Sequence, residues 1–205
     1  MRNIIYIFFL IGTLASAQVK MSQAEAEDLK LKVKSQAATI HTLQSDFIQY
    51  KHLDFLANDI ETSGKLVFKS PDIVKWEYTE PFNYSVLFKD KTLFINNEGN
   101  KSDLDVGSSD LFKQLNGLIV NSIKGDMFDE DQFTITYFKD TSNSVVHSVS
   151  KDEKFSKYIK AFHITFNAEG EVIELKMIEP TDDYTRIIFS NRTVNTPIAD
   201  AVFAH

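Results

Sequence analysis

The 205-residue chain contains no cysteine, only seven glycines and four prolines, and a single tryptophan. The absence of cysteine excludes disulfide bonds, thiol chemistry and thiolate metal sites. No tract rich in proline, glycine or serine is present, so the sequence offers no linker or low-complexity segment that would divide it into domains. Stability therefore has to come from an apolar core, and 17 phenylalanines are available to build it.

Long hydrophobic runs are also missing. The one apolar run, Ile4 to Leu14, is shorter than the roughly 20 residues that a spanning helix needs. It follows a basic residue, Arg2, and ends in the small residues Ala15-Ser16-Ala17, a pattern typical of a secretory signal. We therefore expect residues 1–17 to be a cleaved signal peptide and residues 18–205 to form one exported domain.

Basic residues are in the minority, with 22 Lys and Arg against 29 Asp and Glu, a formal charge of −7. Nucleic acids and anionic membrane surfaces attract proteins through basic patches. The acidic balance therefore argues against nucleic acid as a partner.

The sequence contains none of the common catalytic motifs. The five histidines show no paired metal-ligand spacing, and no nucleophile elbow, phosphate loop or dinucleotide fingerprint is present. The acidic groups Asp103/Asp105 and 129–131 lie in loop-like sequence and read as solvated charge. The sequence thus predicts neither an enzyme nor a metal or cofactor site.

The most informative stretch runs from Ile60 to Asn96. β-branched and aromatic residues cluster there in four short runs, separated by Ser70-Pro71, Glu80-Pro81 and residues 89–91. This pattern predicts an antiparallel meander. Alternation within the runs places large apolar residues on one shared face, which something must cover: Leu66, Phe68, Val74, Trp76, Tyr78, Val86 and Phe88.

Two amphipathic helices are expected. One spans Ser22 to Gln44, with Ser22 and Glu25 as a capping box and an apolar stripe that includes Leu29, Val33 and Leu43. The other spans Ser109 to Ile123. Either could simply pack on a sheet or act as a lid over an apolar concavity.

The remaining chain is predicted as strands and turns. The expected strands are 46–56, 132–138, 145–150, 158–166, 172–178 and 184–190. Residues 97–103 are expected to be a solvated loop, and the tail at 198–203 fits a helical turn or a strand equally well.

The meander resembles a known family, the periplasmic lipoprotein carriers called LolA. The resemblance rests on G-K-L-V-F-K-S-P-D-I-V-K-W-E-Y-T-E-P from Gly64 to Pro81, on S-V-L-F-K-D-K-T-L-F-I-N from Ser85 to Asn96, and on F-I-Q at Phe47 to Gln49. It implies a mainly β fold, a curved and incomplete antiparallel barrel of about 10–11 strands covered by two or more helices.

By the same resemblance, the expected function is that of a periplasmic chaperone in a Gram-negative bacterium. It would carry lipoprotein acyl chains from the inner to the outer membrane, as a monomer, receiving cargo from an inner-membrane ABC-type release complex and delivering it to an outer-membrane receptor or to the membrane. The implied cavity residues are Phe47, Leu66, Phe68, Val74, Trp76, Tyr78, Val86 and Phe88 on the sheet, with Phe112, Leu115 and Ile119 on the lid.

Alternatives remain open at this point. The same apolar residues could form a dry core, and the chain could carry another lipid or serve as a non-catalytic sensor or scaffold of this fold. Ser70, preceded by Lys69, stands where many carriers have an arginine that holds the lid. Serine cannot supply a guanidinium fork, so the sequence does not say how a lid would be held.

Overall fold

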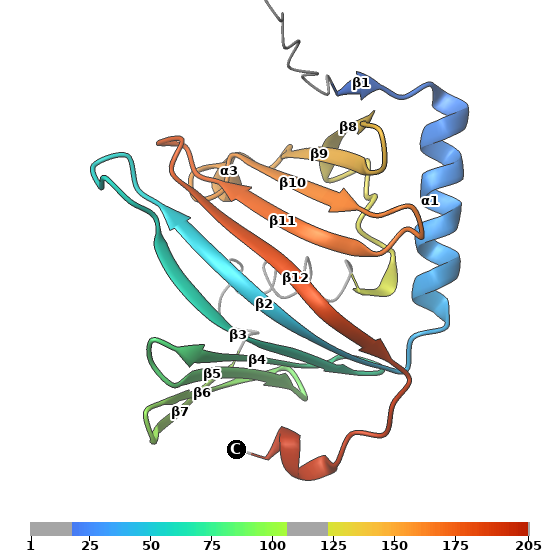
Figure 1. The fold of residues 1–205 in the computed structure, drawn as a ribbon. Coiled ribbons are helices and arrows are strands. Elements are labelled where there is room, and N and C mark those ends of the chain that lie inside the picture. Colours follow the sequence, from blue (N-terminus) through green and yellow to red (C-terminus); the bar gives the residue numbers. More distant parts are fainter. Residues whose placement is uncertain (1–17, 106–122, 205) are drawn as a thin grey trace, which may run out of the picture.

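The computed structural model describes residues 18–105 and 123–204. Within these ranges, twelve strands form one antiparallel sheet in the order β1-β8-β9-β10-β11-β12-β2-β3-β4-β5-β6-β7. The first half of the chain supplies the strands from β2 to β7 and the second half those from β8 to β12, and the two halves join where β12 pairs with β2. The sheet is curved and open, which confirms the mainly β fold expected from the sequence (Figure 1).

The twelve strands of the described residues have the following bounds. They are β1 (Val19–Lys20), β2 (Thr42–His52), β3 (Ile60–Lys69), β4 (Ile73–Glu80), β5 (Tyr84–Lys89), β6 (Thr92–Asn97), β7 (Asn100–Asp105), β8 (Phe133–Lys139), β9 (Ser144–Ser150), β10 (Ala161–Phe166), β11 (Val172–Ile178) and β12 (Tyr184–Val194).

Helix α1 (Gln23–Ala38) begins as the sequence predicts. The Ser22 side chain accepts a hydrogen bond from the Glu25 backbone, and the Glu25 carboxylate accepts one from the Ser22 backbone, which completes the capping box. Its buried stripe is Ala26, Leu29, Val33 and Ala37. The Glu25 carboxylate also binds the Lys139 ammonium at the end of β8, and this contact ties the start of the helix to the sheet.

The predicted helix was too long at its C-terminal end. The structure ends α1 at Ala38 and places Leu43 in β2, opposite Phe68 of β3 and Val194 of β12. Leu43 continues the helical spacing by coincidence. This segment pairs with β3 on one side and with β12 on the other, so β2 starts at Thr42 and not at Asp46.

Residues 97–103 are not a loop, as the sequence suggested, but mostly strand. Glu98 and Gly99 both adopt positive φ, 50° and 91°, and form a two-residue turn between β6 and β7. A turn of this kind matches the twist of a hairpin. Every residue of β7 is exposed, so the strand carries a polar sequence that lacks the apolar alternation used to recognise strands.

Two short helical segments complete the described fold. A single turn, α3 (Glu153–Ser156), precedes β10 and shortens that strand relative to the expectation of 158–166. The chain tail forms a 3₁₀ turn, η2 (Asp200–Phe203). The expected signal peptide and nearly all of the expected helix at Ser109 to Ile123 lie outside the described residues.

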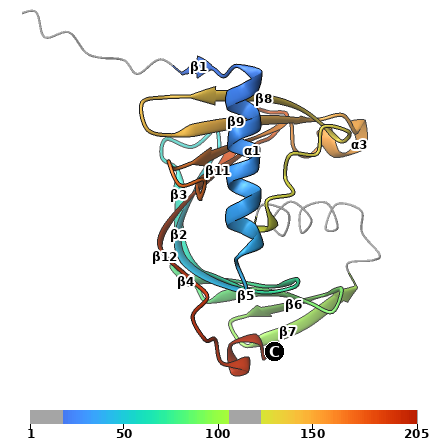
Figure 2. The ribbon, with the colours of Figure 1, turned by 90° about the vertical axis from the view of Figure 1, so that its right-hand side faces the viewer.

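The strands curve around an apolar trough. Seen along the trough, the sheet has the outline of an open C, and α1 stands across one end of it (Figure 2). The opposite, convex face of β3, β5 and β6 packs against η2 through Val67, Leu87 and Phe203.

Candidate functional site

The register of the meander places the predicted apolar residues on one face. Leu66 of β3 lies opposite Trp76 of β4, which lies opposite Val86 of β5. One step along, Phe68, Val74 and Phe88 form a second row of the same kind. The concave face of the sheet is therefore apolar across three adjacent strands, as alternation in the sequence indicated.

Helix α1 covers one end of this face. Leu29 and Val33 pack with Val146, Ile164 and Phe166 from the second half of the sheet. Leu43 packs with the rows of the meander instead. Between these two clusters the side chains do not meet, and a hollow remains.

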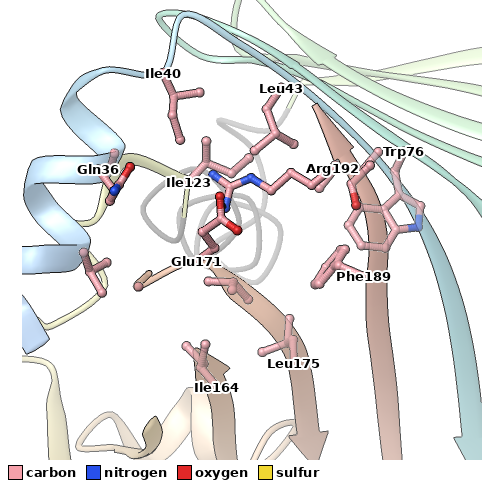
Figure 3. A pocket seen from close by; sticks show the side chains of 16 residues that line it. Gln36, Ile40, Leu43, Trp76, Ile123, Ile164, Glu171, Leu175, Phe189 and Arg192 are labelled. Carbon is pink, nitrogen blue, oxygen red and sulfur yellow. The ribbon is translucent and has the colours of Figure 1, made fainter. Parts of the chain in front are cut away.

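The hollow has a volume of about 770 Å³, including the part that opens to solvent. Its wall combines α1, both halves of the sheet and two turns (Figure 3). The lining residues are Val33, Gln36, Ala37, Ile40, Leu43, Ser45, Leu66, Trp76, Ile123, Ile164, Gly170, Glu171, Val172, Leu175, Phe189 and Arg192. The wall is predominantly apolar, as the walls of small-molecule sites are.

Aromatic rings form one wall of the hollow. Trp76 contacts Phe47 with ring centroids 4.5 Å apart, and Phe189 meets Trp76 edge-on at 6.1 Å. Phe47 is only 1% exposed and supports Trp76 from within the sheet. Tyr78 extends the row, and its hydroxyl donates to Gln49 at 3.1 Å. Burial raises the pKa of Tyr78 above its usual value, so this hydroxyl remains a neutral donor.

Some of the predicted cavity residues line the hollow, and the others pack next to or behind the residues that line it. Leu66 and Trp76 line the hollow. The others among the described set lie on the same face or beneath it. Phe68 and Val74 are buried beside Leu43, and Phe88 packs against these residues. Phe47 contacts the ring of Trp76, and Tyr78 contacts the ring of Phe47. Val86 pairs with Trp76 across the β4–β5 ladder. Phe112, Leu115 and Ile119 lie outside the described residues.

The residues expected to form the cavity did not include the far wall of the hollow. In this wall, Ile164 and Leu175 come from β10 and β11. Their alternation was visible in the sequence, but only pairing across the β12–β2 junction brings them opposite Trp76. Val172 lines the hollow and its neighbour Ile173 does not, because the β10–β11 register shifts at Thr165/Phe166.

A second register shift brings a charged residue into the hollow. Between Ser190 and Thr193, β12 has one more residue than β2 opposite it, and Asn191 adopts a φ of 51°. Such a bulge reverses the alternation of faces. Arg192 consequently shares the concave face with Ile187 and Phe189, although its even number would place it on the convex face.

Arg192 is paired with Glu171 at the turn before β11. Its Nη1 lies 3.1 Å from Glu171 Oε1, and Asn167 donates to Glu171 Oε2 at 3.0 Å. The arginine side chain is 21% exposed. Burial lowers the pKa of Arg192 below its usual value and Glu171 opposes that change, yet an arginine remains charged at any physiological pH.

Among residues 18–105 and 123–204, no group of three or more His, Asp or Glu side chains could hold a metal ion. The described helices include none with the length and hydropathy of a membrane span.

Comparison with known families identifies the fold. The family model described as "Outer membrane lipoprotein carrier protein LolA" matches residues 38–205, which include every strand from β2 to β12. The chain belongs to the LolA family. Since the match also covers most of the wall of the hollow, the LolA relationship concerns the candidate site as well as the scaffold.

Three solved structures are similar to this chain at low sequence identity. A crystal structure of MucB covers 90% of this chain and 64% of its own, with 12% identity and a TM-score of 0.52. A LolA superfamily protein from Nitrosomonas europaea covers 88% and 97%, with 10% identity and a TM-score of 0.48. Mycobacterium tuberculosis lipoprotein LppX covers 87% and 99%, with 8% identity and a TM-score of 0.49. Curated protein sequences gave no match.

Proposed function

We propose that the hollow binds the acyl chains of lipoproteins and that the protein carries them through the periplasm from the inner to the outer membrane. The observation that carries this proposal is an apolar hollow, walled by Trp76, Phe189 and Leu175, on the concave face of a LolA-family sheet. On this proposal, residues 1–17 direct export, an inner-membrane ABC-type complex supplies the cargo, and an outer-membrane receptor or the membrane itself accepts it.

The energetics explain why such cargo requires a carrier. Burying an acyl chain is worth about 0.8 kcal/mol per methylene group, so three chains represent on the order of 30 kcal/mol. A lipoprotein that exposed its acyl chains to water would not leave the membrane at a useful rate. The carrier must also release them, which favours a partly open hollow over a closed cavity.

The decisive experiment is a release assay. Purified protein from Gln18 onward is added to energised spheroplasts, and labelled lipoproteins are followed in the soluble fraction. We expect a one-to-one complex of carrier and lipoprotein. If nothing is released while the protein still binds an apolar fluorophore, the cargo is a different lipid; if both fail, a sensor or scaffold role replaces the carrier role.

A substitution in the wall tests the assignment of the hollow itself. Trp76→Ala should weaken binding of an apolar fluorophore, because the largest ring of the wall is lost. Lys157→Ala, on the exposed surface beyond α3, is the control and should bind as the unmodified protein does. Equal affinity of both folded variants would contradict the proposed site.

A second candidate function is supported by one observation. The ion pair of Glu171 and Arg192 lies in the wall of the hollow, where a purely hydrocarbon cargo would need no charge. A LolA-family carrier of another lipid, with a polar group placed inside the hollow, would use it.

A further inference from the structure

The feature that remains unexplained is the hydrogen bonding of Arg192. Of the described residues lining the hollow, only Glu171 and Arg192 are charged. A guanidinium has five N–H donors. Arg192 has one ion-pair contact, from Nη1 to Glu171, and its Nε is buried with no hydrogen-bond partner. A buried donor without an acceptor is costly and uncommon in folded proteins.

A second arginine on the same strand shows what a purely structural pair looks like here. Arg186 of β12 binds Glu174 of β11 on the convex face, through Nε at 3.0 Å and Nη2 at 2.7 Å. Its Nε is therefore satisfied within the protein. Arg192 lies on the same strand as Arg186, and Glu171 lies in the turn before β11, yet Arg192 Nε is left for another acceptor.

The charge of the site restricts that acceptor. Glu171 already balances Arg192, and Asn167 holds the glutamate in place. A carboxylate or phosphate entering the hollow would add an unbalanced negative charge to a largely apolar space, which is strongly unfavourable. A neutral carbonyl oxygen would accept the hydrogen bond from Nε and would leave the pair neutral.

We propose that Arg192 binds the ester or amide carbonyl at the polar end of an acyl chain, so that the hollow selects acyl esters and amides over free fatty acids. The inference rests on the proposed function, since it assumes that the hollow takes an acyl chain. The bulge at Asn191 is what places Arg192 at this position, and the chain would extend from there along Phe189, Trp76 and Leu175.

Trp76, the chain's single tryptophan, reports on the hollow by its emission. Three probes are titrated at pH 8 below their solubility limits: methyl octanoate, octanoate and pentylbenzene, which lacks a hydrogen-bond acceptor.

The variant Arg192→Leu/Glu171→Leu removes the ion pair without leaving a charge unpaired. We expect it to bind methyl octanoate about tenfold more weakly, the effect of one hydrogen bond to a charged donor, and pentylbenzene no more weakly than before.

Two further variants sharpen the result. Glu171→Gln leaves Arg192 unbalanced and should raise the affinity for octanoate, because the anion then meets a net positive charge. Arg186→Leu/Glu174→Leu makes the matched change on the convex face and should alter none of the three affinities.

The outcomes separate this inference from the proposed function. If no probe changes Trp76 emission in the unmodified protein, both are wrong. If all bind but the variant at Arg192 and Glu171 loses ester and hydrocarbon equally, or if octanoate binds the unmodified protein more tightly than the ester, only the carbonyl inference is wrong. Should that variant fail to fold, the Arg192 Nε–H resonance of the unmodified protein decides, because methyl octanoate should shift it and pentylbenzene should not.

Discussion

Both faces of the meander contain buried apolar residues, but the two faces are closed differently. On the convex face, Val67 and Leu87 are covered by Phe203 of η2, and all three are at most 5% exposed. On the concave face, Leu66 and Trp76 border a hollow of about 770 Å³. Apolar composition alone therefore does not distinguish a core from a binding surface; the shape of the covering element does.

The largest expected effect is a loss of stability when the residue that covers the convex face is removed. Phe203→Ala removes the ring that covers Val67 and Leu87, and we expect the free energy of unfolding to fall by about 3 kcal/mol. Urea unfolding followed by Trp76 emission measures it as a lower midpoint at an unchanged slope. Affinity for an acyl ester should not change, and a loss of affinity in the folded variant would show that the two faces are coupled.

A smaller effect is expected on the open face. Phe189→Ala removes a ring that lines the hollow, and ligand affinity should fall by about 1.5 kcal/mol, roughly tenfold. The preceding residue, Ile188, lies on the other face of β12 and is half-buried. Ile188→Ala is thus the matched control in a displacement assay. Similar losses in the two variants would mean that the faces are assigned wrongly.

The smallest expected effect is a dependence of the protein's stability on pH. His163 stacks on His147, with ring centroids 3.6 Å apart, and lies beside Lys176 on the convex face. Burial, with the nearby charges, lowers the pKa of His163 to about 4. Between that value and the ordinary pKa of histidine near 6.5 the unfolded chain binds more protons, so stability should decrease as pH falls through this window.

Ligand binding should not follow the same pH dependence, because neither histidine lines the hollow. Urea midpoints at pH 7 and pH 5, for the unmodified protein and for His163→Phe, provide the measurement. The variant should lose less stability on acidification. A pH dependence of equal size in both would assign the effect to other groups.

The sequence predicted the scaffold better than the site. Alternation and turn residues located the meander, and the capping box at Ser22 fixed the start of α1. The end of α1 was misplaced because Leu43 satisfies both helical spacing and strand pairing. The strand β7 was missed because an exposed edge strand needs no apolar alternation.

The candidate site was predicted on one side only. Trp76 and Leu66 were accessible to sequence reasoning because they lie in a recognisable motif. Arg192 was not, because its position depends on a one-residue bulge that reverses the faces of β12. The clue in the sequence is limited to Asn191, a residue type that tolerates positive φ. Pairing between distant halves of the chain, which brings Phe189 into contact with Trp76, has no local signal at all.

The sheet is open at both ends, and this has a consequence for how the molecule behaves in a crowded compartment. An unpaired strand edge invites other chains to add to it, the first step of fibrous aggregation. Here one edge, β1, is only two residues long, and the other, β7, carries Lys101 and Asp103 and is exposed throughout. The protein thereby combines an apolar trough with edge strands that are short or charged, and such edges resist the addition of further copies.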